Sequence, residues 1–164
     1  MRPRSMRAPS CARCCAPDFF PSLHSFHRQK ERHRMQTAEF PLPFVNAPYS
    51  RALFDDDWIF VSGTIGMDYD TQQLAESAED QTRLMMRNIE RYLAACGGRL
   101  DQIVNYTLII AGAEHLGAVV RTLSEVLPTK PTGTAMLAGI AVPKAWVEMQ
   151  VIARKSHGAG GGAR

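Results

Sequence analysis

Residues 58–65 read WIFVSGTI, and this run decides the class of fold. It is filled with aromatic and β-branched residues, which are enriched in strands because they pack well on a pleated surface. Three aspartates at residues 55–57 form a turn before it, and Gly66 and Asp68 supply turn chemistry after it. The run therefore predicts a buried strand, with a short hairpin partner at residues 50–54.

Two helices are predicted beyond this strand, because apolar residues recur there at steps of three and four. The first covers residues 79–96, can be capped by Ser77 with Asp80, and can end at Gly97-Gly98. Its apolar stripe is Met85, Ile89, Tyr92, Leu93 and Cys96. The second is stopped by Pro128. Its stripe is Leu116, Val119, Val120, Leu123 and Leu127.

Three more strands are predicted, at residues 103–110, 134–140 and 145–153. In the last one, Val147, Met149 and Val151 point to one face, and Trp146, Glu148, Gln150 and Ile152 to the other. The order is then β-β-α-β-α-β-β. Amphipathic helices need an apolar sheet to cover, so we expect an α+β sandwich with both helices on one face. The mixed opposite face is typical of a contact with another subunit.

Charge divides the chain into two unequal parts. Residues 1–34 hold 8 basic and 2 acidic residues, which leaves 11 basic and 14 acidic residues for 35–164. The acidic folded part and the lack of a basic cluster with interleaved aromatics disfavour a nucleic-acid partner. No apolar run approaches the ~18 to 20 residues of a membrane span, so we expect a protein without a membrane partner.

Residues 1–38 are interpreted as a disordered basic extension, and residues 156–164 as a flexible tail. Cys11, Cys14, Cys15, His24 and His27 have spacings that a zinc ion could use, but no zinc-finger framework surrounds them. An alternative, which we favour, takes Met35 as the biological start. Cys96 belongs to a helix stripe, so no disulfide framework is implied and a cytoplasmic location is expected.

Five short fragments carry a resemblance to a known family. They are Pro48-Tyr49-Ser50, Phe60-Val61-Ser62-Gly63, Gln81-Thr82 with Asn88-Ile89, Gly97 to Val104, and Pro143-Lys144 leading into Val147-Glu148. In this order and spacing they resemble the RidA/YjgF reactive-intermediate deaminase family over about residues 44–155. The domain is accordingly taken as residues 39–155.

The resemblance implies a chorismate-mutase-like fold and a homotrimer with a central barrel and three clefts between subunits. It also implies hydrolysis of enamines or imines such as 2-aminoacrylate, with no metal and no organic cofactor. The family's loop Pro-x-Arg-Ser holds the substrate carboxylate through its arginine. Counting back from Glu148 to that position gives Gly133, so the arginine is absent, and Val120 replaces the family's asparagine on the second helix.

Seven residues are the candidate site. Glu148 would be the catalytic residue that orients a water. Tyr49 would line the cleft, and Ser62 and Gly63 would bring backbone groups close to a ligand. Gly133 would mark the position of the missing arginine, and Thr134 and the Ala135 amide would donate to a ligand oxygen. Four of the seven residues have a structural alternative: an exposed or interface-paired carboxylate for Glu148, packing for Tyr49, a strand bend for Gly63 and a turn for Gly133. His115 is treated as a surface residue.

Two functions remain open from the sequence. One is hydrolysis of an enamine or imine whose recognised end is not a simple carboxylate, because a bidentate guanidinium grip is missing. The other is a non-catalytic trimer that binds a small metabolite. A ribonuclease function is disfavoured by the acidic folded region.

Overall fold

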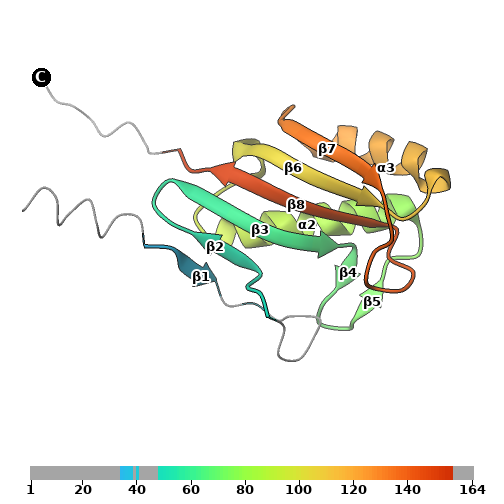
Figure 1. Cartoon of the computed structure of the whole chain (residues 1–164), viewed down its shortest axis with the longest axis horizontal. Coiled ribbons are helices and arrows are strands. Elements are labelled where there is room, and N and C mark those ends of the chain that lie inside the picture. The colour runs from blue at the N-terminus through green and yellow to red at the C-terminus, as the bar shows by residue number, and fades with distance from the viewer. Residues whose placement is uncertain (1–33, 39, 41–47, 157–164) are drawn as a thin grey trace, which may run out of the picture. The chain divides into compact units, whose positions relative to one another are not determined.

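A six-stranded sheet carries both helices on one of its faces (Figure 1). The computed structural model describes residues 34–38, 40 and 48–156, all within the compact unit 33–164. The sheet order is β1-β2-β3-β8-β6-β7, with β6 and β7 parallel and the other pairs antiparallel. The strands are β1 (Gln36–Ala38), β2 (Ala52–Phe54), β3 (Trp58–Ile65), β6 (Ile103–Ile110), β7 (Thr132–Leu137) and β8 (Val147–Arg154).

The three long strands form the core because their side chains alternate between two environments. In β8, Val147, Met149 and Val151 are buried against the helices, whereas Glu148, Gln150 and Ile152 lie on the opposite face, which we call the open face. The alternation predicted for this strand is confirmed from Val147 onward, but the strand begins at Val147 rather than at residue 145. Trp146, expected on the face of Glu148, precedes the strand and stacks on His115 on the helix side. The alternation decides that Glu148 faces away from the helices.

Helix α2 (Ala78–Ala95) begins and ends as its sequence predicts. The Ser77 hydroxyl accepts from the Asp80 amide at 3.0 Å and donates to the Asp80 carboxylate at 2.7 Å. Just beyond the helix end, Gly97 has a φ of 79°, a conformation that glycine adopts at little cost. The whole predicted stripe is buried, including Cys96, which directly follows the last residue of α2.

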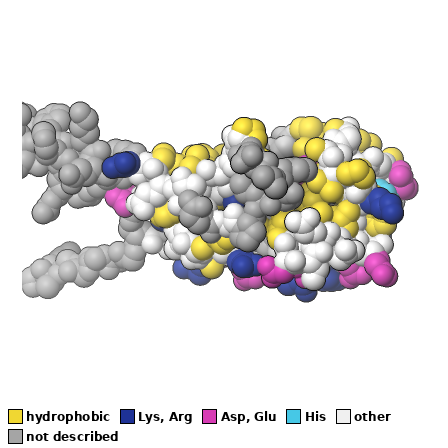
Figure 2. All heavy atoms as spheres, turned by 90° about the horizontal axis from the view of Figure 1, so that it is seen from below, with side chains coloured by type: hydrophobic (Ala, Val, Ile, Leu, Met, Phe, Trp, Pro, Cys, Tyr) yellow, Lys and Arg dark blue, Asp and Glu magenta, His cyan; other side chains and the backbone are white. Residues whose placement is uncertain are grey.

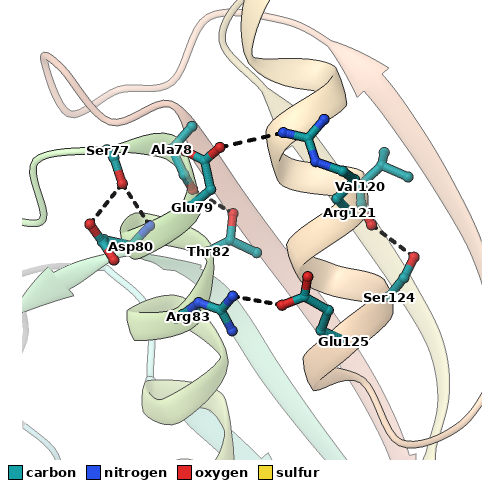
Figure 3. A network of polar contacts seen from close by, with 10 residues as sticks. All are labelled: Ser77, Ala78, Glu79, Asp80, Thr82, Arg83, Val120, Arg121, Ser124 and Glu125. Carbon is teal, nitrogen blue, oxygen red and sulfur yellow. Dashed lines mark hydrogen bonds and ion pairs between the residues drawn. The ribbon is translucent and has the colours of Figure 1, made fainter.

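Helix α3 (Ala113–Val126) lies beside α2, and surface ion pairs join them (Figure 3). Arg83 contacts Glu125 at 2.6 Å, and Arg121 contacts Glu79 at 3.6 Å. These side chains are largely exposed, so each pair contributes less than about 1 kcal/mol. The helix pair is instead held by buried residues such as Val119 and Leu123.

The structure corrects the sequence analysis at four further places. Gln36–Ala38, counted with the basic extension, form β1 and pair with β2. β7 was expected at 134–140 but spans Thr132–Leu137, because parallel pairing with β6 fixes its length. Leu116 and Val120 were placed on the buried stripe of α3 but are 41% and 46% exposed, since α3 leaves the edge strand β7 uncovered. A small ladder of β4 (Met67–Asp68) and β5 (Gln73–Leu74) was not foreseen.

Candidate functional site

Glu148 lies against Gly63, where strand β3 runs beside β8. The pairing of the two strands shifts register between Val61 and Thr64, which places Gly63 in the irregular segment. A methyl group added to Gly63 would coincide with the Glu148 carboxylate, so this close approach requires the glycine. The structure thus brings together two of the residues that the sequence singled out.

The Glu148 carboxyl is half-buried, and burial raises its pKa above the ordinary value. The positive charge of Arg51 acts in the opposite direction and lowers that pKa. Burial is the larger of the two influences. A carboxylate whose pKa is raised is a stronger base than an ordinary one, which is the direction that general base catalysis uses.

Arg51, which the sequence analysis did not single out, lies behind this pair. Its side chain is only 2% exposed, and its Nη1 donates to the Gly63 carbonyl at 2.9 Å. Its Nε and Nη2 have no hydrogen-bond partner among the residues that the structure describes. Three tyrosine rings surround the guanidinium instead, with centroid distances of 4.9 Å for Tyr69, 5.3 Å for Tyr92 and 5.8 Å for Tyr49. Cation–π attraction therefore replaces an acidic partner.

A shallow groove of about 450 Å³ opens next to Gly63. Tyr49, Ser62 and Gly63 line it, together with Phe60 and Gln150. The Ser62 hydroxyl donates to the Ser50 carbonyl at 2.7 Å, which ties the groove floor to the segment before β2. Tyr49 both lines the groove and approaches Arg51, so its packing alternative and its cleft role are compatible.

Gly133, Thr134 and Ala135 lie on β7, at the far edge of the sheet. Register places Thr134 on the open face, because Thr107 of β6 pairs with both Thr134 and Gln150. Gly133 and Ala135 therefore point to the helix side. There Ala135 lines a second cavity of about 480 Å³ between α3 and the sheet edge.

The two groups of candidate residues do not meet within one chain. Strand β6 separates β7 from β8, and Gly133 faces the helices whereas Glu148 faces the open side. If both residues contact one ligand, they must come from different protomers. Neither Arg121 nor Lys130 takes the place of the missing arginine at Gly133: Arg121 pairs with Glu79, Lys130 lines the second cavity, and the atoms nearest to a Cβ added at Gly133 belong to the Tyr106 ring.

Two polar residues of the quoted fragments have structural roles. Gln81 donates to the carbonyls of Ala75 and Lys144 at 3.0 Å each and accepts from the Trp146 amide at 2.8 Å. Asn88 donates to the Met67 carbonyl at 2.8 Å. The Gln81 bonds to Lys144 and Trp146 anchor the segment that leads into β8 and so help to position Glu148, whereas the Asn88 bond holds β4 against α2. His115, treated as a surface residue, is stacked on Trp146 with a centroid distance of 4.7 Å.

Charge on the surface is mixed rather than concentrated. Figure 2 shows basic and acidic side chains interleaved along the edge of the face that it draws. Among the described residues, no cluster of three His, Cys, Asp or Glu side chains could hold a metal ion. Within the same part of the chain, neither helix has both the length and the apolar character that crossing a bilayer requires. The zinc spacing at residues 11–27 lies outside the described residues.

Comparison with known proteins gives consistent matches. A family model described as Endoribonuclease L-PSP matches residues 42–155. Reactive Intermediate Deaminase A, chloroplastic, of Arabidopsis thaliana is 27% identical over 113 residues, which are 68% of this chain and 60% of that protein. The chain thus spans less than two thirds of this relative. A RutC family protein of Aquifex aeolicus is 25% identical over 124 residues, 74% of this chain and 98% of that protein.

Solved structures agree with these matches. The protein YyfA of Yersinia pestis, described as belonging to the conserved Rid protein family, is 29% identical, with a TM-score of 0.66. The match covers 74% of this chain and 100% of that one. The yeast protein YEO7 gives a TM-score of 0.68 at 25% identity, over 75% of this chain and 100% of that one.

Proposed function

The chain belongs to the RidA/YjgF family, and on that premise we propose that it hydrolyses an enamine or imine intermediate to a carbonyl compound and ammonia. The observation that carries the proposal is the Glu148 carboxyl, half-buried with a raised pKa and held against Gly63 beside a groove. A relative named as a reactive intermediate deaminase supports the reaction class.

The reaction adds water across the C=N bond and then expels ammonia. Glu148 takes one proton from water as the water oxygen bonds to the imine carbon, and passes it to the imine nitrogen, which gives a neutral carbinolamine. The same carboxylate then takes the carbinolamine hydroxyl proton and delivers it to nitrogen as the C–N bond breaks, so that a carbonyl compound and ammonia leave. Every atom comes from the imine and one water, so the step needs neither a metal nor an organic cofactor.

Substrate recognition in this proposal differs from that of carboxylate-gripping relatives. With glycine at position 133, a bidentate guanidinium bond is missing, and such charge-assisted bonds are worth roughly 1.5–3 kcal/mol. A loss of that size weakens binding of a simple carboxylate by about one to two powers of ten. Efficient hydrolysis of 2-aminoacrylate is therefore not expected.

A homotrimer is part of the proposal, because Glu148 and Gly133 can share a ligand only across protomers. The open face supports self-association, since Leu53, Trp58, Phe60 and Met136 each remain 37–42% exposed there. Light scattering at micromolar concentration should give three times the chain mass. A monomer at that concentration would remove the shared clefts and with them this account of the site.

The test of the reaction compares wild type with Glu148→Gln for ammonia release from a panel of short-lived imines. General acid–base catalysis contributes about 10²- to 10⁴-fold, so a loss of that order in kcat is expected. Glu90→Gln, an exposed residue of α2, is the matched control and should keep full activity. If no imine turns over faster in wild type than in buffer, the alternative gains: a non-catalytic trimer that binds a small metabolite.

A further inference from the structure

The ring of Tyr106 lies on Gly133. The two residues are register partners in the parallel pair β6 and β7. A Cβ atom added to Gly133 would meet three ring atoms of Tyr106, two of them at 2.6 Å, closer than side chains approach in folded proteins. The two positions are therefore coupled: any residue larger than glycine at 133 forces the tyrosine ring to leave.

Tyr106 also forms one wall of the cavity between α3 and the sheet edge. Most of the lining is apolar: Leu108, Val120, Leu123, Leu127, Pro128, Pro131 and Ala135. No acidic residue lines it, and its one charged residue, Lys130, is exposed. The Tyr106 hydroxyl makes no hydrogen bond to the described residues, so it remains available to a ligand acceptor.

We propose that Tyr106 is a specificity-determining residue of the cleft, and that the cavity it borders accepts an imine with an uncharged aliphatic or aromatic arm. The Tyr106 ring occupies the space above Gly133. A ligand at this position therefore meets an apolar surface, whereas an arginine at position 133 would present a positive charge. This inference rests on the proposed function, since it names the substrate class of the same site. An aromatic arm suits the cavity because its volume of about 480 Å³ is ample for a ring and its lining is apolar.

The experiment measures binding of two unreactive ketones to the full chain by calorimetry. Phenylacetone and phenylpyruvate share the aromatic arm and differ in that a methyl group replaces the carboxylate. Wild type should bind phenylacetone more tightly than phenylpyruvate. Tyr106→Ala should weaken phenylacetone binding about tenfold, because the apolar contact is lost. Tyr106→Phe keeps the ring, so it should retain the preference for the uncharged ketone.

A double variant supplies the opposite result. Tyr106→Ala with Gly133→Arg removes the ring and adds a guanidinium, so it should favour phenylpyruvate by roughly ten- to a hundredfold. Gly133→Arg alone should bind both ketones poorly, because arginine and ring compete for one space. Thermal unfolding of each variant checks that the fold is kept, and Tyr106→Phe keeps the test valid if the double variant does not fold.

Three outcomes would overturn the inference: tighter binding of phenylpyruvate by wild type, binding of neither ketone, or unchanged phenylacetone binding in Tyr106→Ala. Because ketone binding requires no turnover, failure of the proposed hydrolysis is seen separately, in the ammonia assay. A preference for phenylacetone without any ammonia release would leave this inference standing and refute the catalytic function.

Discussion

Gly63→Ala should disable the site and leave the fold almost intact. A Cβ at residue 63 would take the place of the Glu148 carboxylate oxygen and would lie 3.0 Å from the carboxyl carbon. The obstructing group is the end of a flexible side chain, so the carboxylate moves and the strands do not. An off-rotamer side chain costs about 0.5–1.5 kcal/mol. Replacing glycine with alanine raises the free energy of unfolding by about 0.4–1 kcal/mol, because alanine restricts the unfolded chain. We therefore expect a net change in unfolding free energy within about 1 kcal/mol.

The effect on activity should be much larger, because the displaced carboxylate no longer reaches the water. A loss of about 10²- to 10⁴-fold in kcat/KM is expected, equal to that of Glu148→Gln. The double variant should lose no more than either single variant, since both act through the same group. Urea unfolding and ammonia release from an imine are the two assays.

Two other glycines provide controls. A Cβ at Gly66 would collide with the backbone of Gln81, which cannot yield cheaply, so Gly66→Ala should lose about 1–3 kcal/mol of stability. Gly139 has open space around it, and Gly139→Ala should change neither stability nor activity. The reasoning fails if Gly63→Ala is as unstable as Gly66→Ala, if it keeps full activity, or if its effect adds to that of Glu148→Gln.

Three further predictions concern charge and packing. The pKa of Glu148 is raised in the folded chain, so the folded state binds the carboxyl proton more tightly than the unfolded chain does. Protonated Glu148 therefore stabilises the fold, and this stabilisation is lost as pH rises from the unfolded pKa through the folded pKa. Glu148→Gln should therefore gain unfolding free energy over wild type at pH 8 and little at pH 4; a constant gap in urea unfolding would contradict this. Arg51→Met removes a charge that lowers the Glu148 pKa, so the acid limb of the pH–rate profile should move to higher pH, whereas Arg51→Lys should leave it nearly in place. Leu108→Ala, at a residue 1% exposed, should cost about 2–5 kcal/mol in urea unfolding, against less than about 1 kcal/mol for Arg83→Ala in an exposed ion pair.

The sequence predicts most of the fold because period and turn chemistry agree along the chain. The apolar runs at 58–65 and 103–110 coincide with β3 and β6, and the Ser77 cap and Gly97 bound α2 as expected. The errors fall where tertiary pairing decides. β1 has three residues and little pattern of its own, and the ends of β7 are set by β6.

Two features of the candidate site could not be predicted from the sequence, because both depend on residues that only the fold brings together. Arg51 stands between Ser50 and Ala52 and looks like an ordinary surface cation, because arginine is almost never buried without an acidic partner. Its burial depends on three tyrosines far apart in sequence, at 49, 69 and 92, which only the fold brings together. The coupling of Tyr106 to Gly133 is likewise a matter of strand register and has no local signal.

Strand register also bears on the proposed sharing of clefts between protomers. Ile109 pairs with Glu148 on one side and with Met136 on the other, so the β7 residue in line with Glu148 is Met136 rather than Gly133. A one-residue slip, which would reverse the faces, is prevented by the buried alternate side chains.

The sharing of clefts can be tested by complementation. If each cleft takes Glu148 from one protomer and the second cavity, which Val120 lines, from its neighbour, two inactive variants should complement each other. The two variants, Glu148→Gln and Val120→Arg, would be mixed in equal amounts, dissociated and reassembled. A cleft is intact only when its Glu148 comes from the Val120→Arg variant and its Val120 comes from the Glu148→Gln variant. Random reassembly should therefore restore about a quarter of the clefts. Ammonia release from the mixture should then exceed that of either variant alone. No recovery, with mixed trimers demonstrated by mass spectrometry, would mean that the two halves do not serve one ligand.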